Sequence, residues 1–502
     1  MFSSTNEKIN NYKGWKVPNP NYTIPIVSLN ESSSDTNTLS AQNIFKSYIS
    51  QRKPIVFRNE NGKLSQNLDF NNLNKWMITN EYLKKEAGSE TVMVEKRAGT
   101  SNMDTFGKGN EIQMKFNDFI TLMEKGDTIH YLTTQDVQAN EDGKPDIMAP
   151  FMKTLSKWFP LRPHIMGNLI PQNINIWMGN TPPPSHNNDN NHQNSNTSNK
   201  YGISSGLHHD YHDNLYILLR GRKRFRLYSP IDAQKMYTRG ILHQVHSNGR
   251  INYKGDVTTA YGADLKADAA AKAAKAQIIA QQNLIKAEQA LVDGKEGAKE
   301  KLEKAEQMLQ DAMDAIIDAE MDESIDDADY DDHDHDEGEE ESCDLFDSNQ
   351  HKDIDFEKEM EIYESEMKDD NQNEYDFNDD ISLEDTRYLV DKTVKNPDNF
   401  SKIEPHLLDN ESELSKLYPE ILKANAAFCD LKAGDIMYLP ASWFHEVTSF
   451  GDNDCHKEQE LNNSLGHLAL NYWFHPPDNL NDFEHPYSTD FWPNDFKERF
   501  HE

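Results

Sequence analysis

Cysteine is scarce in this sequence: its 502 residues include only Cys343, Cys429 and Cys455, and none of them forms a Cys-x-x-Cys pair. Three thiols at these spacings cannot build a disulfide framework or a four-ligand zinc module, which favours a reducing intracellular compartment. The sequence has no run of about 18 apolar residues, and residues 1–8 lack the apolar stretch of a signal peptide. We therefore expect a soluble protein of the cytoplasm or the nucleus, without a membrane-spanning segment.

Clusters of basic residues are also lacking. Asp and Glu outnumber Lys and Arg by 86 to 51, which gives a formal net charge of −35. Most of this charge lies in one segment, because residues 321–380 contain 28 Asp and Glu against three Lys and no Arg, a net charge of −25. Direct binding to a nucleic-acid backbone is not expected of such a chain. Acidic segments of this kind are typically disordered. This acidic segment could attract a basic protein as a partner.

Aromatic residues, in contrast, are plentiful enough for a core, with 22 Phe, 20 Tyr and 7 Trp. Alternation of apolar and polar residues predicts β-strands through much of the chain. The predicted strands span residues 53–57, 91–95, 128–133, 173–178, 214–220, 222–228, 435–439, 444–449 and 467–475, and a helix is predicted over residues 115–125. Only Gly221 separates two of these strands, 214–220 and 222–228, which predicts a β-hairpin.

A large insert, residues 256–395, interrupts the strands. Its first part, residues 256–320, is rich in Ala, Lys and Glu and has apolar residues at helical spacing, with glycines at 294 and 297, which predicts an antiparallel helical hairpin. Its second part, residues 321–382, is the acidic segment and is expected to be disordered. The expected organisation is a flexible arm (1–40), the first part of a β domain (41–255, with an Asn-rich loop at 181–199), the insert (256–395) and the second part of the β domain (396–502).

Two distant patches predict one metal site, Leu207–Asp210 and Leu439–His445. Side chains alternate along a strand, so His208 and Asp210 share a face while His209 points the other way. Adding His445 from a second strand gives two imidazoles and one carboxylate, a facial set that leaves open positions on a ferrous ion. The two halves of the chain must therefore combine, and antiparallel strands favour an all-β barrel or sandwich.

A buried lysine supports this site. Alternation places Lys223 with Phe225 and Leu227 on the inward face of one strand. An inward lysine is costly unless it meets an anion, and a small dicarboxylate bound to the metal would supply one. A lysine whose stem reaches the barrel rim is the alternative. Asn214 and Asn471 also fall on apolar strand faces, where each amide could serve the metal site or only cap a strand.

Taken in order, these motifs are recognisable. The stretches Gly206–Tyr216, Gly221–Phe225, Gly434–Val447 and Leu470–Trp473 resemble the JmjC-domain oxygenases, in particular the cupin-like small hydroxylase branch that includes factor-inhibiting HIF and the JmjC lysyl hydroxylase. The resemblance covers roughly residues 45–255 and 400–490, and the insert lies outside it.

This resemblance implies a double-stranded β-helix (jelly roll or cupin) core, mainly β with flanking helices. It implies Fe(II) held by His208, Asp210 and His445, with 2-oxoglutarate and O₂ as cosubstrates. The far carboxylate of 2-oxoglutarate would bind Lys223. The remaining residues that the resemblance places at the site are Tyr131, Ser205, Asn214 and Asn471.

The expected activity is hydroxylation of a protein side chain, with release of succinate and CO₂. A histone lysine demethylase would use the same iron chemistry, but the three cysteines could not build the zinc modules that often accompany such enzymes. A non-catalytic cupin-fold protein that binds partners through its acidic insert is the alternative from a different class.

Overall fold

The computed structural model describes residues 9–29, 40–59, 61–64, 68–96, 110–139, 143–181, 202–256, 258–321, 397–450 and 466–500. The described residues of 1–319 and of 387–502 belong to one compact unit. The acidic segment over residues 322–382 and the Asn-rich loop over residues 182–199 lie outside the described residues, so their disorder stays a prediction. None of the described helices is long and apolar enough to cross a lipid bilayer.

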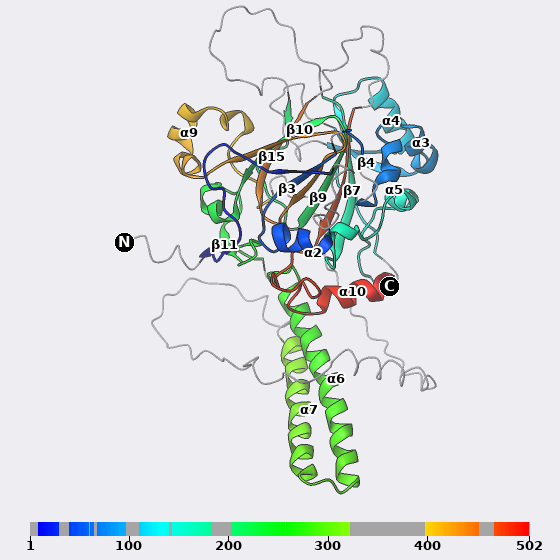
Figure 1. Ribbon diagram of the computed structural model, residues 1–502, viewed down its shortest axis with the longest axis vertical. Coiled ribbons are helices and arrows are strands. Elements are labelled where there is room, and N and C mark those ends of the chain that lie inside the picture. The colour runs from blue at the N-terminus through cyan, green and yellow to red at the C-terminus, as the bar shows by residue number, and fades with distance from the viewer. Residues whose placement is uncertain are drawn as a thin grey trace, which may run out of the picture. The chain divides into compact units, whose positions relative to one another are not determined.

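Two β-sheets form the core (Figure 1). The first sheet contains, in spatial order, β1 (Tyr22–Thr23), β13 (Ala427–Lys432), β10 (Arg222–Tyr228), β15 (Phe444–Phe450) and β8 (Ile203–Ser204). The second contains β2 (Ile26–Ser28), β3 (Ile55–Arg58), β14 (Ile436–Leu439), β9 (Asp213–Arg220), β16 (His467–Phe474), β7 (Pro171–Gly179), β6 (His130–Leu132), β4 (Thr91–Lys96) and β5 (Asn110–Lys115). A separate ribbon pairs β11 (Leu242–Val245) with β12 (Ile251–Tyr253). The predicted double-stranded β-helix is confirmed.

Strands from before and after the insert alternate at the centre of both sheets. In the first sheet β10 lies between β13 and β15, and in the second β9 lies between β14 and β16, with every one of these pairings antiparallel. Each central strand therefore completes its hydrogen bonds only with strands from the other half of the chain. The two parts consequently fold as one domain around the insert.

The connection from β9 to β10 differs from the prediction. These strands do not pair with each other, so the hairpin predicted over residues 214–228 is wrong. Gly221 has a φ of 83°, and a Cβ at this position would lie 2.7 Å from the Cβ of His467. The chain turns a corner at this glycine and passes from the second sheet to the first. Two alternating runs joined by one glycine look the same in a hairpin and in such a corner.

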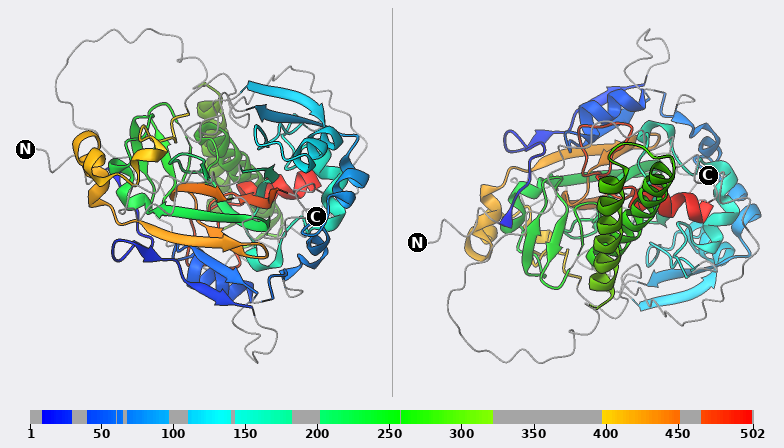
Figure 2. Two further views of the ribbon diagram at one scale, coloured as in Figure 1. Left: turned by 90° about the horizontal axis from the view of Figure 1, so that it is seen from above. Right: turned by 90° about the horizontal axis from the view of Figure 1, so that it is seen from below.

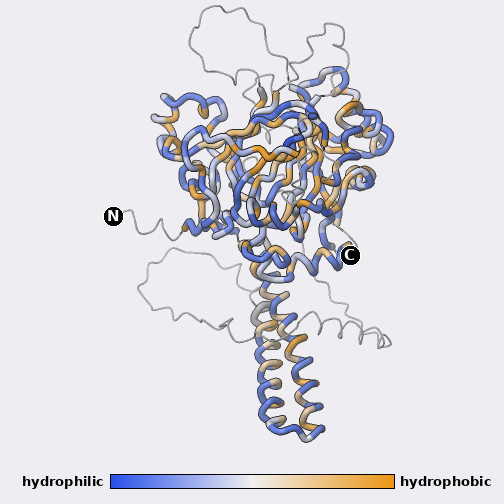
Figure 3. The backbone as a smooth tube through the Cα atoms, viewed as in Figure 1, coloured by the Kyte–Doolittle hydropathy of each residue, from blue (hydrophilic) through white to orange (hydrophobic). Residues whose placement is uncertain are grey.

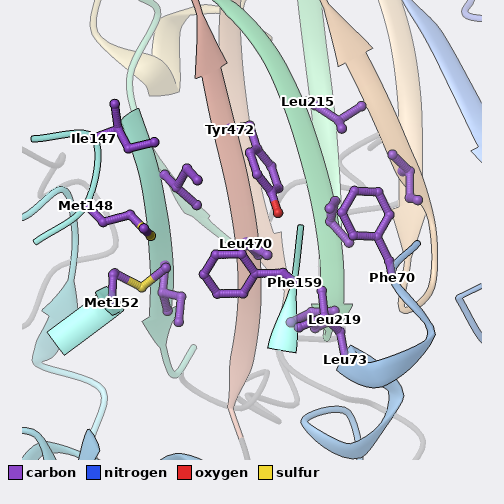
Figure 4. Close-up of a cluster of buried hydrophobic side chains, with 14 of the residues drawn as sticks. Phe70, Leu73, Ile147, Met148, Met152, Phe159, Leu215, Leu219, Leu470 and Tyr472 are labelled. Carbon is purple, nitrogen blue, oxygen red and sulfur yellow. The ribbon is translucent and has the colours of Figure 1, made fainter. Parts of the chain in front are cut away.

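Both faces of β9 are buried, which explains its nearly continuous apolar sequence. Leu215, Ile217 and Leu219 belong to the large core on the outer face of the second sheet, part of which Figure 4 shows between this sheet and the neighbouring helical segments. Tyr216 and Leu218 belong instead to a core between the two sheets, where they meet residues of the first sheet such as Phe225. In Figure 3 the hydrophobic segments gather in these strands.

Short helices cover the domain. Five of them contribute buried side chains to the outer core: α2 (Ala41–Ile44), α3 (Glu81–Ala87), α4 (Phe116–Glu124), α5 (Pro150–Leu155) and α10 (Phe491–Phe500). A sixth, α9 (Glu411–Leu417), packs Leu414 into a third cluster beside the β11–β12 ribbon. Residues 9–29 differ from the predicted flexible arm, because β1 and β2 join the sheets and Ile24 is 1% exposed.

The first part of the insert is the predicted helical hairpin. Helix α6 (Leu265–Val292) begins at Asp264, whose carboxylate accepts hydrogen bonds from the first-turn amides, and α7 (Ala298–Met321) runs beside it (Figures 1 and 2). Apart from Asp268 in the first turn of α6, the buried positions in the described part of the hairpin are alanines that recur every seven residues within each helix: Ala273, Ala280, Ala287, Ala298, Ala305 and Ala312. Ile278, Ile285 and Val292, which also recur every seven residues, are 36%, 64% and 82% exposed.

Candidate metal centre

The three predicted ligands converge where two short segments pair. His208 follows β8, and His445 lies in β15; the His208 amide donates to the His445 carbonyl at 3.0 Å, and the His445 amide donates to the His208 carbonyl at 2.6 Å. One ligand atom from each of His208, Asp210 and His445 lies within 4.8 Å of the others. Among the described residues, this is the one group of three or more metal-binding side chains. The predicted triad is therefore assembled across 237 positions of sequence.

Both histidines are held in the tautomer that leaves Nε2 free to bind a metal. Nδ1 of His208 lies 2.9 Å from the Gly206 carbonyl oxygen, and Nδ1 of His445 lies 2.9 Å from the Trp443 carbonyl oxygen. A carbonyl oxygen can only accept, so each Nδ1 carries the proton and each Nε2 keeps its lone pair. The Nε2 atom of His445 lies 3.7 Å from Oδ2 of Asp210, which places the free nitrogen beside the carboxylate.

Burial keeps His208 and His209 uncharged. Burial and, to a smaller extent, the neighbouring His445 lower the pKa of His208 to about 4, so this imidazole is neutral near pH 7. Burial also lowers the pKa of His209 to about 3. His209 points away from the metal site, and its Nε2 pairs with the Tyr253 hydroxyl at 2.8 Å. The alternation predicted for residues 208–210 thus separates a metal ligand from a structural histidine.

A buried ion pair that sequence analysis missed ties the two ligand segments together. The Asp213 carboxylate accepts from the Arg52 guanidinium and from the Tyr438 hydroxyl at 2.7 Å. It also accepts at 2.9 Å from the amide of Ala441, in the loop that leads to His445. Arg52 and Asp213 are both fully buried. Asp213 follows Asp210 closely in sequence, so it links the start of β9 to the loop before β15.

Lys223 faces the interior between the sheets, as alternation predicted. It is 4% exposed and sits opposite Ser449, on the strand pair in which Leu227 sits opposite His445. Lys223 and His445 are therefore four positions apart along the same inner face, roughly 13 Å at the rise of a β-strand. Its Nζ lies 5.8 Å from the centre of the Tyr216 ring.

The other residues expected at the site line the same interior, and two further aromatics join them. Tyr131 is 3% exposed, and its ring lies 6.5 Å from that of Trp177. The Trp177 indole donates to Oδ1 of Asn471 at 2.7 Å, and the Asn471 amide reaches Oδ1 of Asn214 at 3.5 Å. Tyr216 and Trp177 were missed as site residues, although their places on strand faces beside Asn214 and Asn175 could have indicated them.

The hydroxyl of Ser205 forms hydrogen bonds with backbone groups. It accepts from the Val447 amide at 3.0 Å and lies 3.0 Å from the Gly206 carbonyl oxygen, to which it donates. These bonds join β8 to β15 just before the ligand His208. The contact of Ser205 with a cosubstrate stays a prediction, as do the cosubstrate contacts of Lys223, Tyr131, Asn214 and Asn471.

The residues present fit both expected groups. Two free imidazole nitrogens and a carboxylate within 4.8 Å are a ligand set for a ferrous ion. Beside Lys223, the buried hydroxyl of Tyr216 makes no hydrogen bond within the described part of the chain. A buried hydroxyl without a partner is unfavourable, and a carboxylate placed between Lys223 and Tyr216 would pair with both.

Comparison with known proteins identifies the family. Residues 41–480 match the profile of the family described as "Cupin-like domain". The chain is 28% identical over 512 aligned positions, 96% of its own length and 90% of the relative's, to "JmjC domain-containing protein 4" of Schizosaccharomyces pombe. A shorter match, 34% identical over 67 residues, joins 13% of the chain to 16% of "JmjC domain-containing protein E" of Dictyostelium discoideum.

The chain belongs to the JmjC family of cupin-like domains. Domains of this family are generally Fe(II)- and 2-oxoglutarate-dependent oxygenases, and the His-Asp-His group is compatible with that chemistry.

Proposed function

We propose that this protein is a 2-oxoglutarate-dependent dioxygenase that hydroxylates a protein side chain and releases succinate and CO₂. The observation that supports this most directly is the pairing of His208 with His445, which brings Asp210 into a two-histidine, one-carboxylate set within 4.8 Å. Family membership supports the same reaction class.

His208, Asp210 and His445 would hold the ferrous ion. When bound, it would provide redox chemistry with O₂ and coordinate 2-oxoglutarate. The chain's own contribution would be to bring the three ligands together and to keep the imidazole of His208 neutral, with the remaining positions on the ion left for cosubstrate and substrate. The hydrogen bonds from each Nδ1 to a backbone carbonyl hold the rings in this orientation.

Lys223 would orient 2-oxoglutarate through its far carboxylate. The lysine is buried on the inner face, along the strand pair that carries His445, and the Tyr216 hydroxyl next to it is available as a second donor. A charge-assisted contact at this end would direct the oxo-acid end of the cosubstrate toward the metal ligands. Tyr131, Asn214 and Asn471 would complete the pocket wall.

Hydroxylation and demethylation would both begin at such a site, and the products separate them. The purified protein, supplied with Fe(II), 2-oxoglutarate and peptides captured by a metal-deficient Asp210→Ala variant, should release succinate and add one oxygen atom to a side chain. Loss of a methyl group from a histone lysine would identify a demethylase instead. Absence of Fe(II) binding and of succinate release would favour a non-catalytic binding protein.

The charge and composition of the chain support a proposal about its partner and its location. We propose a basic protein as the partner of the acidic segment, and the cytoplasm or the nucleus as the compartment. At low ionic strength a partner held by this segment should bind more tightly than at high ionic strength, because exposed charges are screened by salt. A pull-down with the full chain across a salt series tests this.

A further inference from the structure

The segments that flank the insert contact the segment that carries two of the three metal ligands. Before the insert, Arg250 donates to the Tyr211 carbonyl at 3.1 Å and to the hydroxyl of Thr258, and Tyr253 pairs with His209. After the insert, residues 399–401 run antiparallel to residues 207–209. The two segments between which the insert begins and ends are therefore held beside the metal centre.

The returning segment makes a ladder with the ligand segment. The amide of His209 donates to the Asn399 carbonyl at 3.2 Å, and the amide of Ser401 donates to the Leu207 carbonyl at 2.8 Å. The Asn399 side chain adds a hydrogen bond to the His209 carbonyl. Because His208 pairs with His445 on its other edge, it forms the middle strand of a short three-stranded arrangement.

Within this arrangement, Phe400 stacks on the ligand. The ring centres of Phe400 and His208 lie 4.7 Å apart and their planes differ by 9°. The His445 ring lies 4.3 Å from His208 at an angle of 56°. His208 is half-buried while His445 is 4% exposed, so the surrounding core restrains His208 less. Torsions at the Cβ–Cγ bond of histidine are broad, and a flat ring against one face restricts this rotation.

We propose that Phe400 is a positioning residue for the iron ligand His208, so that the segment that directly follows the insert forms part of the metal centre. Two contacts fix the imidazole plane: the hydrogen bond from Nδ1 to the Gly206 carbonyl and the stacked ring of Phe400. The role of Phe400 depends on the proposed function, because it requires His208 to bind a metal.

The test measures metal binding without turnover. Co(II) serves as the probe, with its dissociation constant from calorimetry and its ligand-field absorption spectrum recorded on the full-length protein. The variants are Phe400→Ala, which removes the ring; Phe400→Leu, which keeps apolar volume; and Phe400→Tyr, which keeps the aromatic face. Phe428→Ala is the matched control, since Phe428 is also half-buried and its ring lies beside Arg226 instead of the metal ligands.

We expect Phe400→Ala and Phe400→Leu to weaken Co(II) binding about tenfold and to alter the Co(II) spectrum, as loss of a residue that orients a metal ligand does. Phe400→Tyr should keep the wild-type affinity and spectrum, and so should Phe428→Ala. Thermal unfolding of the metal-free variants shows which of them fold. If Phe400→Ala does not fold, the comparison of Phe400→Leu with the wild type still tests the proposal.

Two results would overturn the proposal in distinguishable ways. If the wild-type protein binds Co(II) and Phe400→Leu binds it equally well with the same spectrum, the positioning role is wrong while the metal centre stands. If the wild-type protein binds no Co(II), the proposed function fails and the role of Phe400 fails with it.

Discussion

Lys223 and His445 lie on the same inner face of the paired strands β10 and β15, four positions apart along the ladder. Because a metal-binding side chain lies at one end of this face and a buried cation near the other, we propose that 2-oxoglutarate, a molecule with two acidic ends, binds between them. The cosubstrate would supply an anion to a lysine that lies among Phe225, Leu227 and Tyr216 between the sheets.

Replacing Lys223 should therefore weaken the use of 2-oxoglutarate. We expect Lys223→Met to raise the concentration of 2-oxoglutarate needed for half-maximal succinate release about 10- to 100-fold, because one charge-assisted hydrogen bond is lost. Arg222→Met is the control, since Arg222 is exposed on the opposite face of the same strand. If both variants need the same concentration of 2-oxoglutarate, Lys223 does not bind the cosubstrate.

The ion pair between Arg52 and Asp213 should be important for stability. Asp213→Asn leaves a buried guanidinium without its counter-charge and is expected to lower the free energy of unfolding by about 3–5 kcal/mol. Urea denaturation of the metal-free protein measures this. Glu413→Gln, in a pair with Lys416 whose side chains are 40% and 64% exposed, should cost less than about 1 kcal/mol. Similar losses of unfolding free energy in the two variants would argue against a stabilising role for the buried ion pair of Asp213.

Acid should destabilise the metal-free protein through its buried histidines. Burial lowers the pKa of His208 to about 4 and that of His209 to about 3, so the unfolded chain binds more protons than the folded chain below the ordinary histidine pKa of about 6.5. The contribution of these two histidines to the free energy of unfolding is fully present above about pH 6.5. It declines as the pH falls toward about 4, by up to about 3 kcal/mol for each histidine.

Urea denaturation at about pH 7.5 and about pH 5 measures this decline. The difference between the two pH values should be smaller in His209→Gln than in the wild type, and unchanged in His243→Gln, because His243 is exposed. A difference that His209→Gln leaves intact would show that His209 is not the source of the acid sensitivity.

The alanine seam of the helical hairpin should not accept larger side chains. Ala280 is 1% exposed in α6, and Ala280→Leu is expected to lower the free energy of unfolding by about 1–3 kcal/mol through overpacking. Ala270→Leu, at an exposed position of the same helix, should change it by less than about 0.5 kcal/mol. Hydrogen exchange of the α6 amides measures the local loss of stability. Equal protection of these amides in Ala280→Leu and Ala270→Leu would show that Ala280 does not lie in the contact between the two helices.

The sequence predicted the features that depend on local alternation. His208 and Asp210 share a face, His209 turns away, and Lys223 points inward with Phe225, all of which follow from the period of a β-strand. It did not separate a hairpin from a corner at Gly221, because that choice depends on contacts with distant strands such as the one that begins with His467.

Long-range partners could not be predicted either. Arg52 meets Asp213 across 161 positions, and Phe400 reaches His208 from the far side of the insert. In the hairpin, isoleucines and alanines both recur every seven residues, so the spacing alone did not show that the alanines form the buried seam. The alanines form the contact between the helices because their small side chains allow the two helices to approach closely.

The most direct test of the metal centre is equilibrium dialysis of the full-length protein against Fe(II) without oxygen. The wild-type protein and the exposed-histidine variant His243→Ala should each retain one ion per chain, whereas His208→Ala, Asp210→Ala and His445→Ala should retain none. Retention of the ion by the three ligand variants, or its absence from the wild type, would contradict the proposal that these side chains hold iron.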